Sequence, residues 1–286
     1  MSTVEDWLVR CTGRRGLVIS CYRDMGGESG CGVWSCDVEL EGLPRQVILK
    51  VYQAGFEDDS GPGPGGAARK SALALSELCR FGVPTPDLIG HASRGDMAAI
   101  VYQKVQVRPW TATTRLEAAE ALAKLHMIPI SEVGDELACL VRSSVPNRDR
   151  TLNGLKDYRD LEESASEWWA EYPELRGEIE WLRAGGEPQS ARGALVHGDY
   201  FSGNLLASDA GLKIVDWDLL ALGDPMWDLG FLVGADREVG EEEAAGVVAA
   251  YSRMAPVDRA VVSWHRRCWR AFWKLRELRE RGLAET

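Results

Sequence analysis

The sequence lacks the long apolar runs, paired cysteines and basic excess that mark several classes of protein. No segment approaches the roughly 20 apolar residues of a membrane-spanning helix. The opening MSTVEDWLVR lacks the apolar region of a signal peptide. The seven cysteines are an odd number, and no CxxC motif occurs. We therefore expect reduced thiols in a cytoplasmic protein, with no disulfide framework, zinc site or membrane partner.

Acidic residues exceed basic ones, which gives a net charge of −11 and an isoelectric point near 5.0. Binding to nucleic acid needs a basic surface, so we expect no nucleic-acid partner. The acidity has two interpretations: attraction of a cationic small-molecule substrate, or simple solubility. The 286 residues, 45% of them hydrophobic, suffice for a large core or for two lobes that share a cleft, in a monomer or a homodimer.

The most informative stretch runs from Leu195 to Phe231 and reads LVHGDYFSGNLLASDAGLKIVDWDLLALGDPMWDLGF. Apolar runs at 205–206 and 212–215 predict short strands that bring the neighbouring polar residues to one edge. Acidic residues in such apolar surroundings are candidates for a functional site. The candidate residues in the stretch are His197, Asp199, Asn204, Asp216, Asp218, Asp224 and Asp228.

The order of these residues matches the requirements of phosphoryl transfer. Asn204 follows Asp199 after four intervening residues, and Asp216 follows the second apolar run. Protein kinases use this order for a carboxylate that accepts the proton of the substrate hydroxyl, then an amide and a carboxylate that bind Mg²⁺. Carboxylate and amide oxygens are ligands that Mg²⁺ prefers. The alternative is a turn-rich loop, because Asp and Asn favour turns.

Several short motifs in this stretch carry a family resemblance. They are His197-Gly198-Asp199-Tyr200, Asn204-Leu205-Leu206, Ile214-Val215-Asp216-Trp217-Asp218, Gly223-Asp224-Pro225 and Asp228-Leu229. Together they resemble the aminoglycoside phosphotransferase and choline-kinase-like family. Gly198, where protein kinases have Arg, and Trp217-Asp218, where they have Phe-Gly, are typical of this group.

The resemblance implies an α+β, protein-kinase-like fold with two lobes. A small β-rich lobe at 1–103 would bind the nucleotide, and a larger helical lobe at 104–286 would carry the catalytic loop and the substrate pocket. The cofactors would be ATP or GTP with Mg²⁺. In this assignment Asp199 is the catalytic residue, Asn204 and Asp216 are the metal ligands, and His197 and Asp218 assist them.

The first third of the chain holds the candidate nucleotide site. Strands are expected at 17–21 and 33–40, joined by the glycine-rich segment 25–32. Glycine lets backbone amides approach phosphates closely, although such a hairpin is also a common turn. The resemblance matches Gly27 and Ser29 to the Gly-x-Ser pattern that covers the phosphates. Gly30 stands where the family often has Asn.

Lys50 lies in the apolar strand expected at 46–52. A buried lysine needs an anionic partner, and the resemblance assigns Lys50 to the α- and β-phosphates. The alternative is an edge-strand lysine that extends to solvent. Protein kinases pair this lysine with a Glu early on the next helix, expected here at 69–81, where Arg69 and Lys70 stand instead. The partner stays open, with Glu77 and Glu57 as candidates.

A strand expected at 98–105 leads into the hinge between the lobes, where the resemblance implies adenine contacts from Gln103 and Val105. Thr114 and Glu117 form a capping box that predicts a helix up to Met127. His126 on that helix is expected to be a buried structural histidine.

The remaining expectations concern the C-terminal helices. Segment 155–187 alternates acids with tryptophans, which fits either an acidic wall for a cationic ligand or a solvated helix face. Helices are also expected at 244–254 and 260–282, with Trp269 and Trp273 in the core. Asp224 and Asp228 are expected to tie loops to helix N-termini.

The resulting hypothesis is phosphorylation of a hydroxyl on a small cationic antibiotic, which would confer resistance. The antibiotic would be an aminoglycoside or a tuberactinomycin-type peptide such as viomycin or capreomycin. One alternative is a small-metabolite kinase for choline, homoserine, a thiosugar or fructosamine. Another is a nucleotide-binding pseudokinase, which the missing helix Glu favours and the intact Lys50, Asp199, Asn204 and Asp216 oppose.

Overall fold

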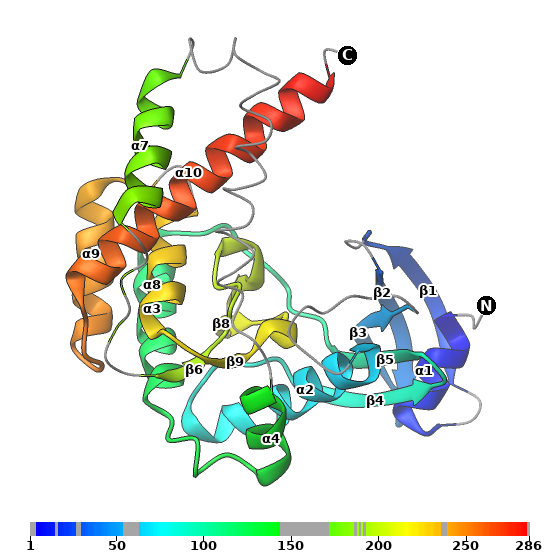
Figure 1. Cartoon of the computed structure of the whole chain (residues 1–286). Helices are drawn as coiled ribbons and strands as arrows, with labels where there is room; N and C mark the ends of the chain where they lie inside the picture. Colours follow the sequence, from blue (N-terminus) through cyan, green and yellow to red (C-terminus); the bar gives the residue numbers. More distant parts are fainter. Residues whose placement is uncertain are drawn as a thin grey trace.

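The computed structural model describes residues 4–14, 17–26, 30–53, 63–143, 172–185, 188, 190, 193–235 and 239–284. A β-rich N-terminal part is followed by a mainly helical C-terminal part, as predicted (Figure 1). None of the described helices is both long and apolar enough to cross a membrane. All seven cysteines are free thiols.

The N-terminal part is built on one antiparallel sheet in the order β1-β2-β3-β5-β4. A tight turn at Glu41 and Gly42, both with positive φ, joins β2 to β3 and pairs Leu40 with Leu43. The strands β1, β2, β3 and β5 confirm the expected ones, whereas β4 was not predicted. The strands are β1 (Val18–Asp24), β2 (Cys31–Leu40), β3 (Leu43–Tyr52), β4 (Leu88–Arg94) and β5 (Met97–Gln103).

The two faces of β3 serve different purposes. Val47, Leu49 and Val51 pack in one apolar cluster with helix α1 (Val4–Thr12). Because side chains alternate along a strand, Lys50 and Tyr52 point to the opposite face. On that side, α2 (Gly63–Glu77) lies along the sheet and packs on β5 and β4 (Figure 1).

Helix α2 begins six residues before the expected start at Arg69. Its first turns contain glycines, which are poor helix formers. Ala67 and Ala68 in those turns are fully buried, so packing against the sheet outweighs the weak local preference. The helix continues as a 3₁₀ turn, η1 (Leu78–Phe81), and ends at Gly82 with φ 77°.

Helices dominate the C-terminal part, where α10 crosses α8 and packs beside α7, and α3 packs on α9 (Figure 1). The predictions for 244–254 and 260–282 are confirmed by α9 and α10. The expected helix at 155–187 is confirmed only over α7, since 144–171 and 186–187 lie outside the described residues. The helices are α3 (Ala112–Met127), α4 (Asp135–Ser143), α7 (Pro173–Gly185), α8 (Pro225–Gly234), α9 (Glu241–Ser252) and α10 (Arg259–Ala284).

The N-cap predicted for α3 is wrong by three residues. The helix begins after Thr111, whose hydroxyl accepts a hydrogen bond from the backbone amide of Thr114 at 3.2 Å. The backbone amide of Thr111 donates in turn to the Thr114 hydroxyl at 3.4 Å. Thr114 therefore occupies the third helical position, and it replaces the Glu of the usual capping box. Glu117 is not part of the cap.

A two-stranded sheet and a hairpin enclosed between its strands bring the segment 194–223 together. Strands β6 (Ala194–Val196) and β9 (Ala221–Gly223) pair, as do β7 (Leu205–Ser208) and β8 (Gly211–Ile214). The runs predicted at 205–206 and 212–215 are thus strands of one hairpin, apart from Val215. Asp216 and Asp218, which lie between β8 and β9, face the side of β3 that carries Lys50.

Candidate active site

The loop after β6 brings Asp199 and Asn204 together. Nδ2 of Asn204 donates to Oδ2 of Asp199 at 2.8 Å and to its backbone carbonyl at 3.0 Å. The backbone amide of Val215 donates to the carbonyl of Asn204 at 3.0 Å, which fixes the end of β8 beside the loop. The convergence expected from the sequence is therefore present, while the chemical roles of these residues stay predictions.

Asp228 anchors the same loop from helix α8. Its carboxylate is fully buried and accepts hydrogen bonds from the backbone amides of His197 at 2.6 Å and Gly198 at 2.9 Å. Gly198 has φ 85°, and a Cβ there would lie 2.8 Å from the backbone oxygen of Leu219. The arginine that protein kinases carry at this position does not fit this backbone.

Asp224 confirms its predicted role at the start of α8. Its carboxylate accepts from the backbone amide of Met226 at 2.8 Å and from Ser190, through the backbone amide at 2.7 Å and the hydroxyl at 2.5 Å. Asp228 also ties a loop to α8, but from inside the helix and not as its cap. A sequence pattern identifies both acids without distinguishing these two geometries.

His197 connects the two halves of the site. Its ring is fully buried, with Nε2 3.0 Å from the backbone oxygen of Val215 and Nδ1 accepting from the Asp199 amide at 3.3 Å. This pattern assigns the proton to Nε2. Burial lowers the pKa of His197, which keeps the ring neutral. Its contacts make it a link between the Asp199 loop and the strand that leads to Asp216.

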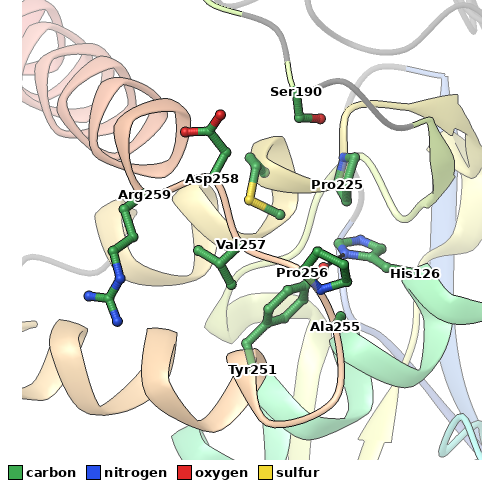
Figure 2. Close-up of a pocket in the computed structure, with 10 residues that line it drawn as sticks. His126, Ser190, Pro225, Tyr251, Ala255, Pro256, Val257, Asp258 and Arg259 are labelled. Atoms are coloured by element: carbon green, nitrogen blue, oxygen red, sulfur yellow. Dashed lines mark hydrogen bonds between the residues drawn. The ribbon is translucent and has the colours of Figure 1, made fainter.

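His126 is a buried, hydrogen-bonded histidine, as predicted. Nδ1 lies 2.8 Å from the Tyr251 hydroxyl, and Nε2 lies 3.3 Å from Oδ2 of Asp228. A cavity of about 500 Å³ opens beside these rings, next to the N-terminus of α8 (Figure 2). Neither Lys50 nor Asp216 lines that cavity, so His126 supports the anchoring acid from a different side.

Asp216 lies at the end of β8 with φ 64° and ψ 64°. Left-handed backbone is uncommon for residues other than glycine, although Asp tolerates it better than most. The conformation directs the carboxylate to Lys50, whose Nζ lies 2.7 Å from Oδ1 of Asp216. The side chain of Asp216 remains 40% exposed, which leaves it accessible to a further ligand.

The acidic partners of Lys50 are Asp216 and Asp218. Nζ of Lys50 lies 2.5 Å from Oδ2 of Asp218, which belongs to the 3₁₀ turn η3 (Trp217–Leu219). The candidate Glu77 is wrong, because that carboxylate accepts from the backbone amide of Gly134 at 2.7 Å. The candidate Glu57 lies outside the described residues. A lysine extended to solvent is also wrong, since Lys50 is 9% exposed.

Charges in this cluster stabilise one another. Burial works to lower the pKa of Lys50, but Asp216 and Asp218 raise it well above its usual value, so the ammonium stays charged. Burial works to raise the pKa of Asp218, whereas Lys50 and hydrogen bonds from Lys50, Ser71 and Tyr52 lower it overall. Burial raises the pKa of Asp216, although Lys50 works to lower it. The cluster is therefore an ionised lysine between two acids, of which Asp218 is the more readily ionised.

The predicted hinge contains two engaged amides and one available amide. The Gln103 amide donates to the backbone oxygen of Asp87 at 2.9 Å, and the Lys104 amide donates to that of Gln46 at 2.9 Å. Within the described part of the chain, the amide of Val105 makes no backbone hydrogen bond. Val105 is thus the better candidate for donation to an adenine ring.

The predicted phosphate-covering residues Gly27 and Ser29 lie outside the described residues. Their neighbours Gly26 and Gly30 have φ values of 82° and 84°. The amide of Val33 donates to the oxygen of Gly26 at 3.0 Å, and Val33 is paired with Lys50 across β2 and β3. The glycine-rich segment therefore begins and ends at the same end of the sheet as Lys50.

A second cavity, of about 560 Å³, lies between α7, the end of α8 and α10. Trp273 lines it and contacts Phe201 with ring centroids 6.0 Å apart, two residues beyond Asp199. Trp273 is half-buried, so its core placement was only partly correct. Trp269 is in the core, as predicted, and stacks on Phe231 with centroids 3.7 Å apart.

The oxygen-rich part of the cluster fits a nucleotide-bound Mg²⁺. No group of three or more acidic, histidine or cysteine side chains forms a metal site among the residues that the structure describes. Mg²⁺ in nucleotide sites commonly uses one or two protein carboxylates together with phosphates and water. The exposed carboxylate of Asp216 and the side-chain amide of Asn204 meet that requirement.

Comparison with known proteins gives a family and a fold. A model of the phosphotransferase enzyme family matches residues 43–271. No curated protein matches the chain. Solved structures do match: an aminoglycoside-3'-phosphotransferase of type VIII has 22% identity and a TM-score of 0.55, and the alignment covers 91% of this chain and 95% of that one.

Two further solved structures broaden the comparison. A spectinomycin phosphotransferase in complex with ADP and spectinomycin has 16% identity and a TM-score of 0.64 over 91% of this chain and 82% of that one. A choline kinase from Streptococcus pneumoniae has 19% identity and a TM-score of 0.56 over 94% of this chain and 88% of that one. At such identities these structures establish the protein-kinase-like fold alone. The family match over most of the chain establishes that this protein belongs to the phosphotransferase enzyme family.

Proposed function

We propose that this phosphotransferase transfers the γ-phosphate of ATP or GTP to a hydroxyl of a small cationic antibiotic. The observation that carries the proposal is the convergence of Lys50 with Asp199, Asn204 and Asp216, which lie in one stretch of the chain far from Lys50 in sequence. The lobes are 1–103 for the nucleotide and 104–286 for the catalytic loop and the substrate pocket.

Asp199 accepts the proton of the attacking hydroxyl and orients it. The hydrogen bond from Asn204 at 2.8 Å fixes the carboxylate, and Asp228 fixes the backbone that carries it. Such positioning is the main contribution that a protein makes to phosphoryl transfer. His197, neutral and buried, keeps the loop beside Asp216 and does not transfer the proton itself.

Lys50 and the hinge bind the nucleotide. The lysine provides a buried positive charge for the α- and β-phosphates, and Asp216 with Asn204 would hold the Mg²⁺ that neutralises the developing charge. Val105 donates its amide to the adenine, while the backbone of Gln103 shapes the hinge. Gly27 and Ser29 cover the phosphates.

The second cavity is the proposed substrate pocket, because Trp273 connects it to the residues after Asp199. Its described lining contains three acids and three bases. Arg267 forms two hydrogen bonds with Glu178, so that acid is already neutralised. The acid-rich segment 155–171 lies outside the described residues.

The charge balance of that lining keeps a metabolite kinase as the second candidate. A substrate with one positive charge, such as choline, needs fewer free carboxylates than an aminoglycoside does. Comparable folds occur in proteins described as choline and fructosamine kinases. The pseudokinase alternative predicts nucleotide binding without turnover.

Phosphate transfer from γ-labelled ATP and GTP to a panel of compounds tests the proposal. The panel contains aminoglycosides, viomycin, capreomycin, choline, homoserine, a thiosugar and a fructosamine. We expect label on an antibiotic, and no label with the Asp199→Ala variant. Label confined to a metabolite would replace the antibiotic by the second candidate. Tight nucleotide binding without any labelled product would favour the pseudokinase.

A further inference from the structure

Asp218 and Asp216 contact the same lysine in very different environments. The side chain of Asp218 is 9% exposed, and that of Asp216 is 40% exposed. Both lie within hydrogen-bonding distance of Nζ of Lys50, at 2.5 Å and 2.7 Å. Only the carboxylate of Asp216 is therefore substantially open to solvent.

Both oxygens of Asp218 accept hydrogen bonds from the protein. Oδ2 accepts from Lys50, and Oδ1 accepts from the hydroxyls of Tyr52 and Ser71, each at 2.6 Å. A buried carboxylate is stable when a cation and several donors surround it in this way. These three donors occupy three of the roughly four lone-pair sites of the carboxylate, and a metal at the remaining site on Oδ2 would lie beside the Lys50 ammonium that the same oxygen already binds.

The three donors come from two elements of the N-terminal part. Lys50 and Tyr52 are two residues apart on β3 and point to the same face, and Ser71 comes from α2. Helix α2 thus supplies a hydroxyl to the lysine cluster at the place where a protein kinase supplies a carboxylate. Asp218 completes the arrangement from the C-terminal part, 168 residues beyond Lys50.

We propose that Asp218 is a positioning residue that, with Tyr52 and Ser71, holds Lys50 for the nucleotide and does not bind Mg²⁺. Asp218 thus takes the place of the missing helix Glu. This assignment replaces the one made from the sequence, in which Asp218 assists the metal ligands. When a nucleotide binds, Lys50 exchanges Asp216 for phosphate and keeps Asp218. The inference rests on the proposed nucleotide site, but not on the identity of the substrate.

Nucleotide binding with and without Mg²⁺, measured by titration calorimetry with ADP, separates the two roles. A metal ligand contributes to the gain in ADP affinity that Mg²⁺ produces. We expect Asp216→Asn to lose most of that gain and Asp218→Asn to keep it within about 3-fold of wild type, a difference of less than one hydrogen bond to a charged group. If Mg²⁺ no longer increased the ADP affinity of the Asp218→Asn variant, the proposal would be overturned.

Two milder variants keep the test valid if Asp218→Asn does not fold. Tyr52→Phe and Ser71→Ala each remove one donor to Asp218 and leave its charge in place. We expect each to lower kcat about 10-fold, because each loses a hydrogen bond to a buried carboxylate, with the Mg²⁺ gain unchanged. Unchanged kcat in both variants would contradict a positioning role.

Matched controls lie on the same elements or carry the same side chain. Ser76→Ala is on the exposed side of α2, and Tyr22→Phe is at an exposed position of β1. Both variants should have the same kcat as wild type and the same gain in ADP affinity from Mg²⁺. A rescue variant combines Asp218→Asn with Ser71→Glu, which returns the carboxylate to α2, and we expect it to recover part of the lost kcat. Absence of both ADP and GDP binding in wild type would instead disprove the proposed function.

Discussion

The side-chain amide of Asn204 donates to the carboxylate of Asp199 across 2.8 Å. Asn204 therefore has two roles in this account: it holds the carboxylate of Asp199, and it is a proposed ligand of Mg²⁺. Asn204→Ala should lower kcat about 100-fold or more, since both the orientation of Asp199 and a metal ligand are lost. Steady-state kinetics across a Mg²⁺ series measures this loss. Asp209→Asn, at an exposed turn, is the control, and equal kcat in wild type and Asn204→Ala would contradict the assignment.

Asp228 provides a prediction of stability. Its buried carboxylate accepts two backbone amides and lies beside His126. Asp228→Ala leaves those donors without their acceptor, so we expect a loss of about 3 kcal/mol or more in the free energy of unfolding. Urea denaturation of wild type, Asp228→Ala and the exposed control Asp209→Ala measures it. If Asp228→Ala lost no more unfolding free energy than the surface control Asp209→Ala, the Asp228 carboxylate would contribute little to stability.

Gly198 and Gly211 form a matched pair for backbone strain. Both have positive φ, at 85° and 95°, but a Cβ at Gly198 would contact Leu219 at 2.8 Å, and a Cβ at Gly211 would meet nothing within 4 Å. Gly211→Ala should cost about 1 kcal/mol from the left-handed backbone alone. Gly198→Ala should cost clearly more and also lower kcat, as thermal unfolding and kinetics would show. Equal losses at both positions would rule out the steric clash.

His197 predicts how stability depends on pH. Burial lowers its pKa in the folded protein below the ordinary value of 6.5, so the unfolded chain binds a proton first as the pH falls. The contribution of neutral His197 to the free energy of unfolding is complete above pH 6.5. It is lost as the pH falls from 6.5 to the lowered pKa of His197 in the folded protein. His197→Gln should flatten the decline of the unfolding free energy below pH 6.5, as measured by urea denaturation at several pH values.

A second histidine serves as the control for that prediction. Burial also lowers the pKa of His91, with a smaller contribution from Arg69, but His91 lies on β4, away from the catalytic loop. His91→Gln should change the pH dependence and leave kcat at neutral pH unaltered. His197→Gln should change both. An unchanged pH profile in His197→Gln would mean that the ring is not kept neutral by burial.

The sequence predicted the motif-bearing loop well because its information is local. Asp199 and Asn204 precede the hairpin of β7 and β8, Asp216 follows it, and these short spacings determine how they meet. Sequence reasoning missed the partner of Lys50 because that contact joins residues 168 positions apart. The second Asp of Asp216-Trp217-Asp218, together with Ser71 on α2, was the available signal, but no local spacing connects Asp218 to Lys50 or to Ser71.

Other differences have local physical causes. The start of α2 was misplaced because buried alanines stabilise a glycine-containing turn that propensity disfavours. The cap of α3 was misplaced because two threonines three residues apart can both act as caps, and only the backbone of Thr111 is extended. Strand β4 contains Gly90 and His91 and lacks a clear alternation of apolar residues, so it gave no strand signal.

The most direct test of the central claim compares Asp199→Ala with wild type in two measurements on the same preparations. Calorimetry with ADP and Mg²⁺ reports nucleotide binding, and γ-phosphate transfer to the accepted compound reports catalysis. We predict nearly unchanged ADP affinity and a loss of turnover of about 1,000-fold or more, because Asp199 orients the hydroxyl and accepts its proton. Turnover close to wild type in Asp199→Ala would contradict the assignment of Asp199 as the catalytic residue.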